Sequence, residues 1–158
     1  MSDFSHLNKE NQPKMVDVGS KNVSKRLAIA EAFVKLGADL MSQLDDSNEL
    51  RAKKGPVFQT AIIAGIQGVK QTPFLIPMCH PLSIDGVNIT IKPFNHETIR
   101  IEVEVKLQGK TGVEMEALMG ANITALTVYD MCKAINPHIE IMKISLVEKT
   151  GGKNDFKR

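Results

Sequence analysis

Two runs of alternating apolar and polar residues, separated by a short polar turn, constrain the fold of this chain most strongly. SIDGVNITIKPF (83–94) and TIRIEVEVKL (98–107) carry isoleucine or valine at every second position over much of their length. Side chains of a strand alternate between its two faces, so the pattern predicts two half-buried strands. The polar Asn95-His96-Glu97 between them is typical of a turn, and together they predict a β-hairpin.

Two longer segments predict helices. Residues 56–70 open with a proline, which is common at the start of a helix, and end near Gln71-Thr72-Pro73. Residues 112–135 read as a long apolar helix that Asn136-Pro137 ends. The segment 139–149 alternates again and predicts a further strand.

The segment RLAIAEAFVKL (26–36) decides the fold class. Its composition allows a helix, whereas Leu27, Ile29 and Phe33 fall on one face of a strand, so propensity leaves both structures open. If it is a strand, the order is βαββαβ. That order is the split pattern of a ferredoxin-like α+β fold, an antiparallel sheet with its helices packed on one face.

Length and flanking composition predict one domain. The 158 residues suit a single domain at 15–150, with a loose polar arm at 1–14 and a Gly/Lys-rich tail at 151–158. Residues 37–46 predict a short helix, and LDDSNELRAKKG, which closes at Gly55, predicts a polar loop.

Composition excludes several classes of function. A net charge of +2, no Trp, one Tyr and six Phe argue against a nucleic-acid partner. Cys79 and Cys132 are 53 residues apart, which gives neither a zinc signature nor a disulfide framework, so no metal site is expected. No signal peptide or membrane-spanning run is found, and we expect a cytoplasmic protein with no membrane contact.

The charges on the predicted helix 112–135 need an explanation, because burying them is costly. Glu116 and Asp130 are 14 residues apart, hence about 40° apart around the axis but about 21 Å apart along it, and Lys133 shares their face. A solvated stripe would explain them on an average helix, but the apolar surroundings favour a cleft. Either the ligand is long, or two chains contribute opposite ends of the helix to one site. We favour the shared site.

Other motifs allow both ordinary and functional readings. Thr111 and Glu114 form a T-x-x-E capping box. GKTG (109–112) lacks the first glycine of a P-loop, because position 104 is a glutamate, although Lys110 beside a helix N-terminus could attract an anion. In PMCHP (77–81) the prolines hold an extended backbone that would aim the imidazole of His80, while a buried thiol and a satisfied histidine are the ordinary alternative.

Motifs along nearly the whole chain resemble the molybdenum cofactor biosynthesis protein C family, also called cyclic pyranopterin monophosphate synthase. GKTGVEMEAL (109–118) followed by YDMCKA (129–134) is the most specific pair. The remaining matches, in chain order, are MVDV (15–18), KG (54–55), AGIQ (64–67), IPMCHPL (76–82) and KTGGK (149–153).

The resemblance implies a strand at 26–36, a ferredoxin-like subunit, and a hexamer of three dimers with active sites at a subunit interface. The family acts in the cytoplasm on 3′,8-cyclo-7,8-dihydro-GTP, which a radical S-adenosylmethionine GTP cyclase makes. It produces cyclic pyranopterin monophosphate and releases pyrophosphate. No organic cofactor or metal is expected, apart from magnesium that could accompany the triphosphate.

Site residues follow from the matching motifs. Asp130 matches the family's active-site residue, and Lys133 and Lys54 are expected to be catalytic with it. The substrate-binding candidates are Met78, Cys79, His80, Glu114, Met115, Glu116 and Lys149; Asp17 and Arg26 belong to the surrounding shell. Ring opening and pterin closure need repeated proton transfers, and pyrophosphate loss needs cations, which these residue types supply. The alternatives are a non-catalytic nucleotide- or pterin-binding oligomer and a structural or RNA-binding ferredoxin-like domain whose charges are merely solvated.

Overall fold

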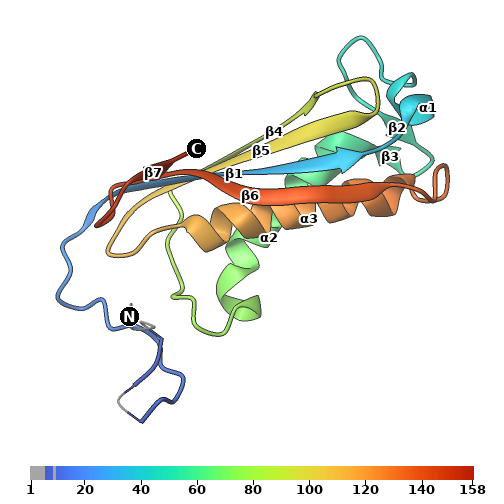
Figure 1. Ribbon diagram of the computed structural model, residues 1–158. Coiled ribbons are helices and arrows are strands. Elements are labelled where there is room, and N and C mark those ends of the chain that lie inside the picture. Colours follow the sequence, from blue (N-terminus) through green and yellow to red (C-terminus); the bar gives the residue numbers. More distant parts are fainter. Residues whose placement is uncertain (1–5, 9) are drawn as a thin grey trace.

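The computed structural model describes residues 6–8 and 10–158, in which a five-stranded antiparallel sheet is covered on one face by two long helices (Figure 1). The sheet order is β4-β5-β1-β6-β7. The strands of this sheet are β1 (Ser24–Lys35), β4 (Gly86–Pro93), β5 (Thr98–Gly109), β6 (Glu140–Thr150) and β7 (Phe156–Lys157). The helices are α1 (Ala38–Met41), α2 (Val57–Leu75) and α3 (Glu114–Cys132), and a small hairpin joins β2 (Arg51–Ala52) to β3 (Gly55–Pro56).

The order of the main elements, β1-α2-β4-β5-α3-β6, confirms the βαββαβ prediction and the ferredoxin-like α+β class. The predicted hairpin is also confirmed, with Ile89 opposite Val103 and Ile91 opposite Ile101. These side chains face the helices, whereas the alternate residues of β5 are polar and partly exposed.

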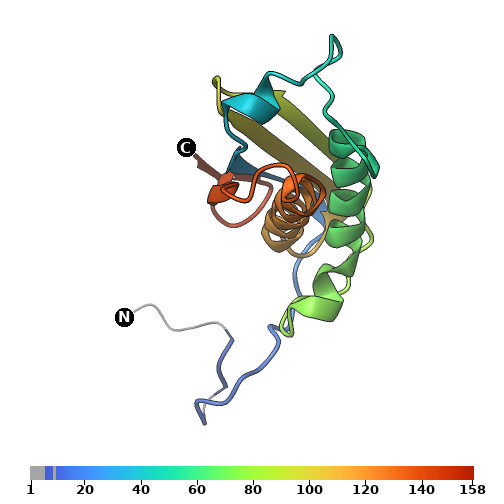
Figure 2. The same cartoon turned by 90° about the vertical axis from the view of Figure 1, so that its right-hand side faces the viewer.

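The segment 26–36 is a strand, but its buried face is not the one formed by its largest side chains. Ala28, Ala30, Ala32 and Val34 are fully buried under the helices. Leu27, Ile29 and Phe33 lie on the opposite face and are partly exposed. β1 is the central strand, and α3 packs directly over it, so small side chains let the helix approach the sheet (Figure 2).

The helix predicted at 56–70 is longer than expected. It runs to Leu75 and contains Pro73, which was predicted to end it. Proline removes one backbone hydrogen bond. The helix nevertheless continues because buried Val69 and Thr72 hold this turn against the core, and the Ile76 N–H donates to the Thr72 carbonyl at 2.9 Å. Packing against the core therefore outweighs the tendency of Pro73 to end the helix.

The long helix is shorter at both ends than the predicted 112–135. It begins at Glu114, and its N-cap, Val113, provides no side-chain cap, so the predicted Thr111–Glu114 capping box is wrong. The Glu114 carboxylate instead accepts a hydrogen bond from Lys149. Residues 133–135 form a turn after the helix ends at Cys132. An ion pair across the fold has replaced a local cap.

The region between β1 and α2 also differs from the prediction. The helix expected at 37–46 is reduced to the four residues of α1, and the expected polar loop contains the β2–β3 hairpin. Within this loop Glu49 and Leu50 are buried. Glu49 accepts hydrogen bonds from the backbone N–H groups of Leu50, Phe58 and Gln59 at 2.8, 2.7 and 3.0 Å. A buried carboxylate therefore anchors the hairpin to the start of α2.

The described segment before β1 and the segment after β6 lie near the same end of the sheet (Figure 1). The expected N-terminal arm lies partly outside the described residues; within it, a single bridge joins Leu7 to Pro13. At the other terminus β7 pairs with β6 through Lys157 opposite Glu148. None of the helices described in 6–8 and 10–158 is long and apolar enough to cross a membrane.

Candidate functional site

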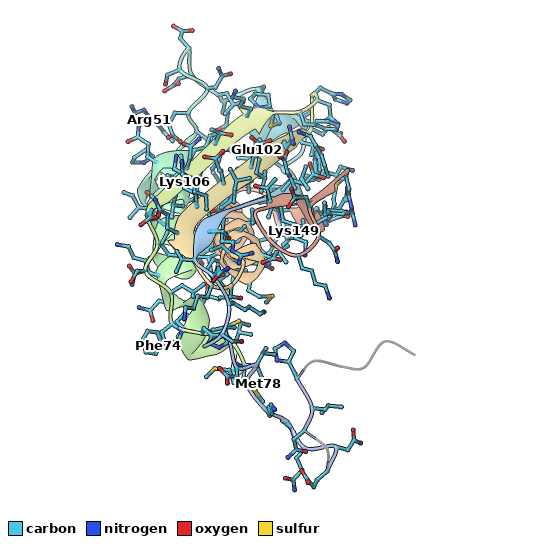
Figure 3. All side chains as sticks on the ribbon, turned by 90° about the vertical axis from the view of Figure 1, so that its left-hand side faces the viewer. Arg51, Phe74, Met78, Glu102, Lys106 and Lys149 are labelled. Atoms are coloured by element: carbon cyan, nitrogen blue, oxygen red, sulfur yellow. The ribbon has the colours of Figure 1, made fainter. Side chains whose placement is uncertain are left out.

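A cavity of about 480 Å³ opens at the N-terminal end of α3. Its wall combines α3 with the loop that follows α2, the end of β6, and segments from both termini. Seven of the predicted site residues line it, namely Met78, Cys79, His80, Glu114, Met115, Glu116 and Lys149. Figure 3 shows Lys149 on β6 above the helices and Met78 beside the N-terminal arm. Residues up to 71 positions apart in the sequence, from Met78 to Lys149, thus face one space.

The loop after α2 brings the Cys-His pair to the cavity. The Cys79 N–H donates to the Ile76 carbonyl at 3.1 Å, which turns the chain immediately after the helix. Cys79 and His80 are both half-buried and line the cavity. Burial raises the pKa of the Cys79 thiol, and the charge of Glu116 raises it further, so this cysteine stays a neutral thiol near pH 7.

The two carboxylates at the start of α3 have different environments. Glu114 Oε1 lies 3.1 Å from Lys149 Nζ, and both side chains are about one-third exposed. Glu116 is only 3% exposed. Burial raises the pKa of Glu116 above that of an ordinary glutamate, its own backbone N–H opposes the rise, and the charge of Glu114 adds to it. The site therefore offers one ion-paired carboxylate and one buried carboxyl group whose pKa is raised.

The other three predicted residues form a separate cluster at the C-terminal end of α3. Asp130 accepts hydrogen bonds from Lys133 at 2.7 Å and from Lys54 at 3.2 Å. Lys54 reaches it from the β2–β3 hairpin, so contact between elements far apart in sequence builds this group. Hydrogen bonds from Lys133 and then Lys54 lower the pKa of Asp130, and Asp130 in turn raises the pKa of Lys133.

The two clusters lie at opposite ends of the 19-residue helix α3. Fourteen residues separate Glu116 from Asp130, which corresponds to about 21 Å along the axis. Neither Asp130, Lys133 nor Lys54 lines the cavity. Within one chain the predicted site is therefore divided into two halves, which we call the cavity half and the Asp130 half.

Several cavity residues were not predicted from the sequence. These are His6, Val16, Val18, Lys21, Leu27, Leu82, Thr111, Gly112, Thr150, Gly152, Lys153 and Asn154. Lys21 follows Gly19-Ser20, and Lys153 follows Gly151-Gly152, so the signal was a lysine beside a glycine-containing turn. Of the two predicted shell residues, Arg26 lines the cavity, whereas Asp17 caps a turn by accepting from the Gly19 N–H at 2.7 Å.

The GKTG segment does not form a P-loop. It follows β5, which is antiparallel to both of its neighbours, whereas a P-loop follows a parallel strand. The ammonium of Lys110 donates to the Gly19 carbonyl at 2.7 Å and so ties the N-terminal segment to the cavity rim. No group of three or more His, Cys, Asp or Glu residues in the described ranges could hold a metal ion.

Comparisons with known proteins agree with one another. The MoaC family model matches residues 15–152. The cyclic pyranopterin monophosphate synthase of Syntrophomonas wolfei is 50% identical over 153 residues, covering 96% of this chain and 95% of that protein. The enzyme of the same name from Helicobacter pylori strain HPAG1 is 47% identical, covering 96% and 94%. Molybdenum cofactor biosynthesis protein 1 of Dictyostelium discoideum is 42% identical over 97% of this chain but only 27% of its own length.

Proposed function

The chain belongs to the MoaC family, and from that premise we propose that it converts 3′,8-cyclo-7,8-dihydro-GTP into cyclic pyranopterin monophosphate and pyrophosphate. The positions of the predicted site residues in the structure support this function independently of sequence similarity. All ten residues expected from the motifs gather in two clusters, one lining a cavity of about 480 Å³ and the other at the opposite end of α3.

The cavity half suits proton transfer to and from a purine-derived ring. Glu116, whose pKa is raised by burial, and His80 are groups that can exchange protons with the ring, and the Glu114–Lys149 pair can hold its polar groups. The Asp130 half supplies two lysines whose ammonium groups share one carboxylate, which suits acid–base work or a phosphate.

We further propose that two chains complete each site. A stripe of side chains on the outer face of α3 follows a heptad-like spacing and remains at least partly exposed: Met115, Met119, Asn122, Leu126, Tyr129 and Lys133. Leu126 is 55% and Met115 is 40% exposed. Such a stripe on an otherwise packed helix supports pairing with a second helix.

The register supports an antiparallel pair of α3 helices. Residue 123 is the midpoint of Glu114–Cys132, and Glu116 and Asp130 are each seven residues from it. A two-fold axis near residue 123 would therefore bring Glu116 of one chain opposite Asp130 of the other. The cavity half of each subunit would then meet the Asp130 half of its partner. The hexamer of three such dimers remains the assembly that we propose.

We also propose where in the cell the protein acts, which enzyme supplies its substrate and which cofactors it needs. We infer a cytoplasmic protein, which agrees with its two unpaired cysteines, and an upstream radical S-adenosylmethionine GTP cyclase as the source of substrate. We expect no nucleic-acid partner, which a gel shift tests. We also expect no organic cofactor and no resident metal, with magnesium at most accompanying the triphosphate; turnover with and without EDTA tests this.

Release of pyrophosphate from purified 3′,8-cyclo-7,8-dihydro-GTP, with the product mass measured in parallel, tests the proposed function. Release together with a cyclic-phosphate pterin supports the synthase. Tight binding without release would instead assign a carrier role to the same cavity. A well-folded oligomer that neither binds nor converts the compound would contradict both.

A further inference from the structure

The hairpin that carries Lys54 is too small to hold its own position. Each of its strands, Arg51–Ala52 and Gly55–Pro56, is only two residues long. An isolated hairpin is marginally stable in water even when it is longer than this. Figure 3 shows Arg51 at the opposite end of the molecule from Met78, which lines the cavity, so the cavity half gives the hairpin no support. The contacts that fix it must come from the residues around it.

The ion pair between Lys54 and Asp130 does not fix the hairpin. Lys54 Nζ lies 3.2 Å from Asp130 Oδ2, but the two side chains are 64% and 52% exposed. Exposed ion pairs contribute little free energy, because water screens them and the ordering of two long side chains costs entropy. Asp130 also has a closer partner, since Lys133 Nζ lies 2.7 Å from its other carboxylate oxygen. The Lys54–Asp130 pair is therefore a consequence of where the hairpin lies.

The buried carboxylate of Glu49 binds the chain on both sides of the hairpin. Its Oε1 accepts from the N–H groups of Leu50 and Phe58 at 2.8 and 2.7 Å, and its Oε2 accepts from the Gln59 N–H at 3.0 Å. Leu50 directly precedes β2, whereas Phe58 and Gln59 lie in the first turn of α2, which directly follows β3. The Val57 N–H donates to the Leu50 carbonyl at 2.8 Å and closes the same segment.

The first turn of α2 has no local side chain that could do this instead. Its N–H groups have no partners within the helix. Pro56 stands at the N-cap without a side-chain hydrogen bond, and the first turn contains no acidic residue. The backbone of Glu49 is itself fixed, because its N–H donates to Asp45 Oδ1 at 3.0 Å and its carbonyl accepts from the Asp45 N–H at 2.9 Å. The turn 45–49 therefore aims the carboxylate at α2.

We propose that Glu49 is a positioning residue for the reaction, which holds the Lys54 ammonium beside Asp130 by fixing the β2–β3 hairpin to the start of α2. The inference rests on the proposed function, in which the Asp130 half takes part in the chemistry. Glu49 does not line the cavity, and its carboxylate binds backbone N–H groups, so it acts through the place of Lys54 and not on the substrate. A catalytic group displaced by about 1 Å can lose about 100-fold in rate.

A double-mutant cycle on turnover separates positioning from simple stabilisation. Glu49→Ala should lower kcat about tenfold or more, because the hairpin no longer holds Lys54 in place. In a Lys54→Ala background the same substitution should lower kcat less than about twofold, since the lysine that it positions is already gone. Its effect on urea unfolding should be the same in both backgrounds. A residue that only stabilises the fold would change kcat by the same factor with and without Lys54.

Glu49→Gln provides a conservative variant that tests the proposal even if Glu49→Ala does not fold. Glutamine keeps one accepting oxygen but turns its amide group toward an N–H donor such as that of Gln59. Its kcat should lie between those of the parent and Glu49→Ala. Asp46→Ala, exposed in the same loop, and Lys53→Ala, exposed in the turn of the hairpin, are the matched controls and should retain parental kcat.

The titration of Asp130 gives a readout that needs no turnover. The cations that face it are Lys133, on the same helix, and Lys54, from the hairpin, and their hydrogen bonds lower its pKa. If Glu49→Ala releases the hairpin, Lys133 stays and Lys54 leaves, so the pKa of Asp130 should rise toward the ordinary value of 3.8, as it should in Lys54→Ala. Carboxyl ¹³C NMR of the aspartate-labelled protein measures this pKa, with Asp130→Asn assigning the signal.

Three results would overturn the proposal. They are parental kcat in a folded Glu49→Ala variant, an equal loss of kcat in both backgrounds, and an unchanged pKa of Asp130 in that variant. Parental kcat in Lys54→Ala would overturn it as well, because no catalytic group would then be positioned. If the parent releases no pyrophosphate but the pKa of Asp130 rises in Glu49→Ala, Glu49 still places Lys54 and it is the proposed reaction that fails.

Discussion

Glu116 is the one buried carboxylate among the predicted site residues, and its burial makes the stability of the protein depend on pH. The folded protein holds the Glu116 proton to a higher pH than the unfolded chain does. Above the ordinary glutamate pKa of 4.5 the unfolded state releases that proton first, so the contribution of Glu116 to stability falls as pH rises toward the raised pKa.

Glu116→Gln should remove the loss of stability that ionisation of this buried carboxyl group causes at higher pH. We expect the variant to be more stable than the parent at pH 7 and to approach the parent's stability at pH 4, as measured by urea unfolding at both values. Glu114→Gln is the matched control, because it breaks the ion pair with Lys149 and should give no such gain at pH 7. A Glu116→Gln variant that is less stable than the parent at pH 7 would contradict the inference that burial raises the pKa of Glu116.

Lys133 is expected to act in the reaction rather than in the fold. Its side chain is 54% exposed and its ion-pair partner is Asp130. Lys133→Ala should lower turnover about 100-fold or more, the usual contribution of a general acid or base, and should leave the unfolding transition unchanged. Lys92→Ala, an exposed lysine on β4, should retain parental turnover. Near-normal turnover of Lys133→Ala would remove this lysine from the mechanism.

At the scale of elements, the start of α2 depends on one buried carboxylate. Glu49 accepts hydrogen bonds from two backbone N–H groups there, those of Phe58 and Gln59, and from the Leu50 N–H in the preceding loop. The hairpin that it anchors carries Lys54 to Asp130. Glu49→Ala should destabilise the protein by about 2 kcal/mol, because buried donors lose their acceptor. Asp46→Ala, in the same loop but exposed, should change stability little. Equal stability of the two variants would show that water replaces the Glu49 carboxylate as the acceptor for these N–H groups.

The contact between α2 and α3 is equally specific. A Cβ at Gly65 would overlap the hydroxyl of Thr124 and approach Ile89 Cδ1 to 2.7 Å, while one at Gly120 would approach Val69 and Val103, each to 2.9 Å. The backbones of the two helices therefore approach each other closely at this point, since a Cβ at Gly65 would also lie 3.2 Å from the Gly120 carbonyl oxygen. Figure 2 shows α2 and α3 as neighbours under the sheet. Gly65→Ala should destabilise the protein by about 1–3 kcal/mol despite its better helix propensity, as thermal unfolding would show. Gln67→Ala, exposed on the same helix, provides the control.

At the scale of the whole molecule, a site shared between two chains predicts complementation. His80→Ala disables the cavity half and Lys133→Ala the Asp130 half. In an equal mixture that re-equilibrates, about half of the dimers are mixed, and one of their two sites is intact, so activity should recover to about a quarter of the parent's. A mixture that stays inactive, although subunit exchange is shown by labelled chains, would place each complete site within one chain.

The sequence alone determined the elements whose signals are local. Period-two alternation predicts β4, β5 and β6, although only β5 buries every second residue along most of its length and β6 has no fully buried residue. Helix periodicity, with its spacing of about 21 Å between Glu116 and Asp130, already favoured a site shared between two chains. The strand at 26–36 was settled only by resemblance to a family, since its composition suits both structures. The motifs named ten candidate site residues, seven of which line one cavity.

Tertiary structure decided whatever depends on contacts between distant segments. Only packing shows that the alanines of β1, rather than Leu27 and Phe33, face the helices, that α2 continues through Pro73, and that Glu114 pairs with Lys149 instead of capping α3. Local propensities are small compared with the burial of apolar side chains that opposes them. The cavity arises for the same reason, because Lys21 and Lys153, which both line it, are 132 residues apart in the sequence until the pairing of β1 with β6 brings their segments together.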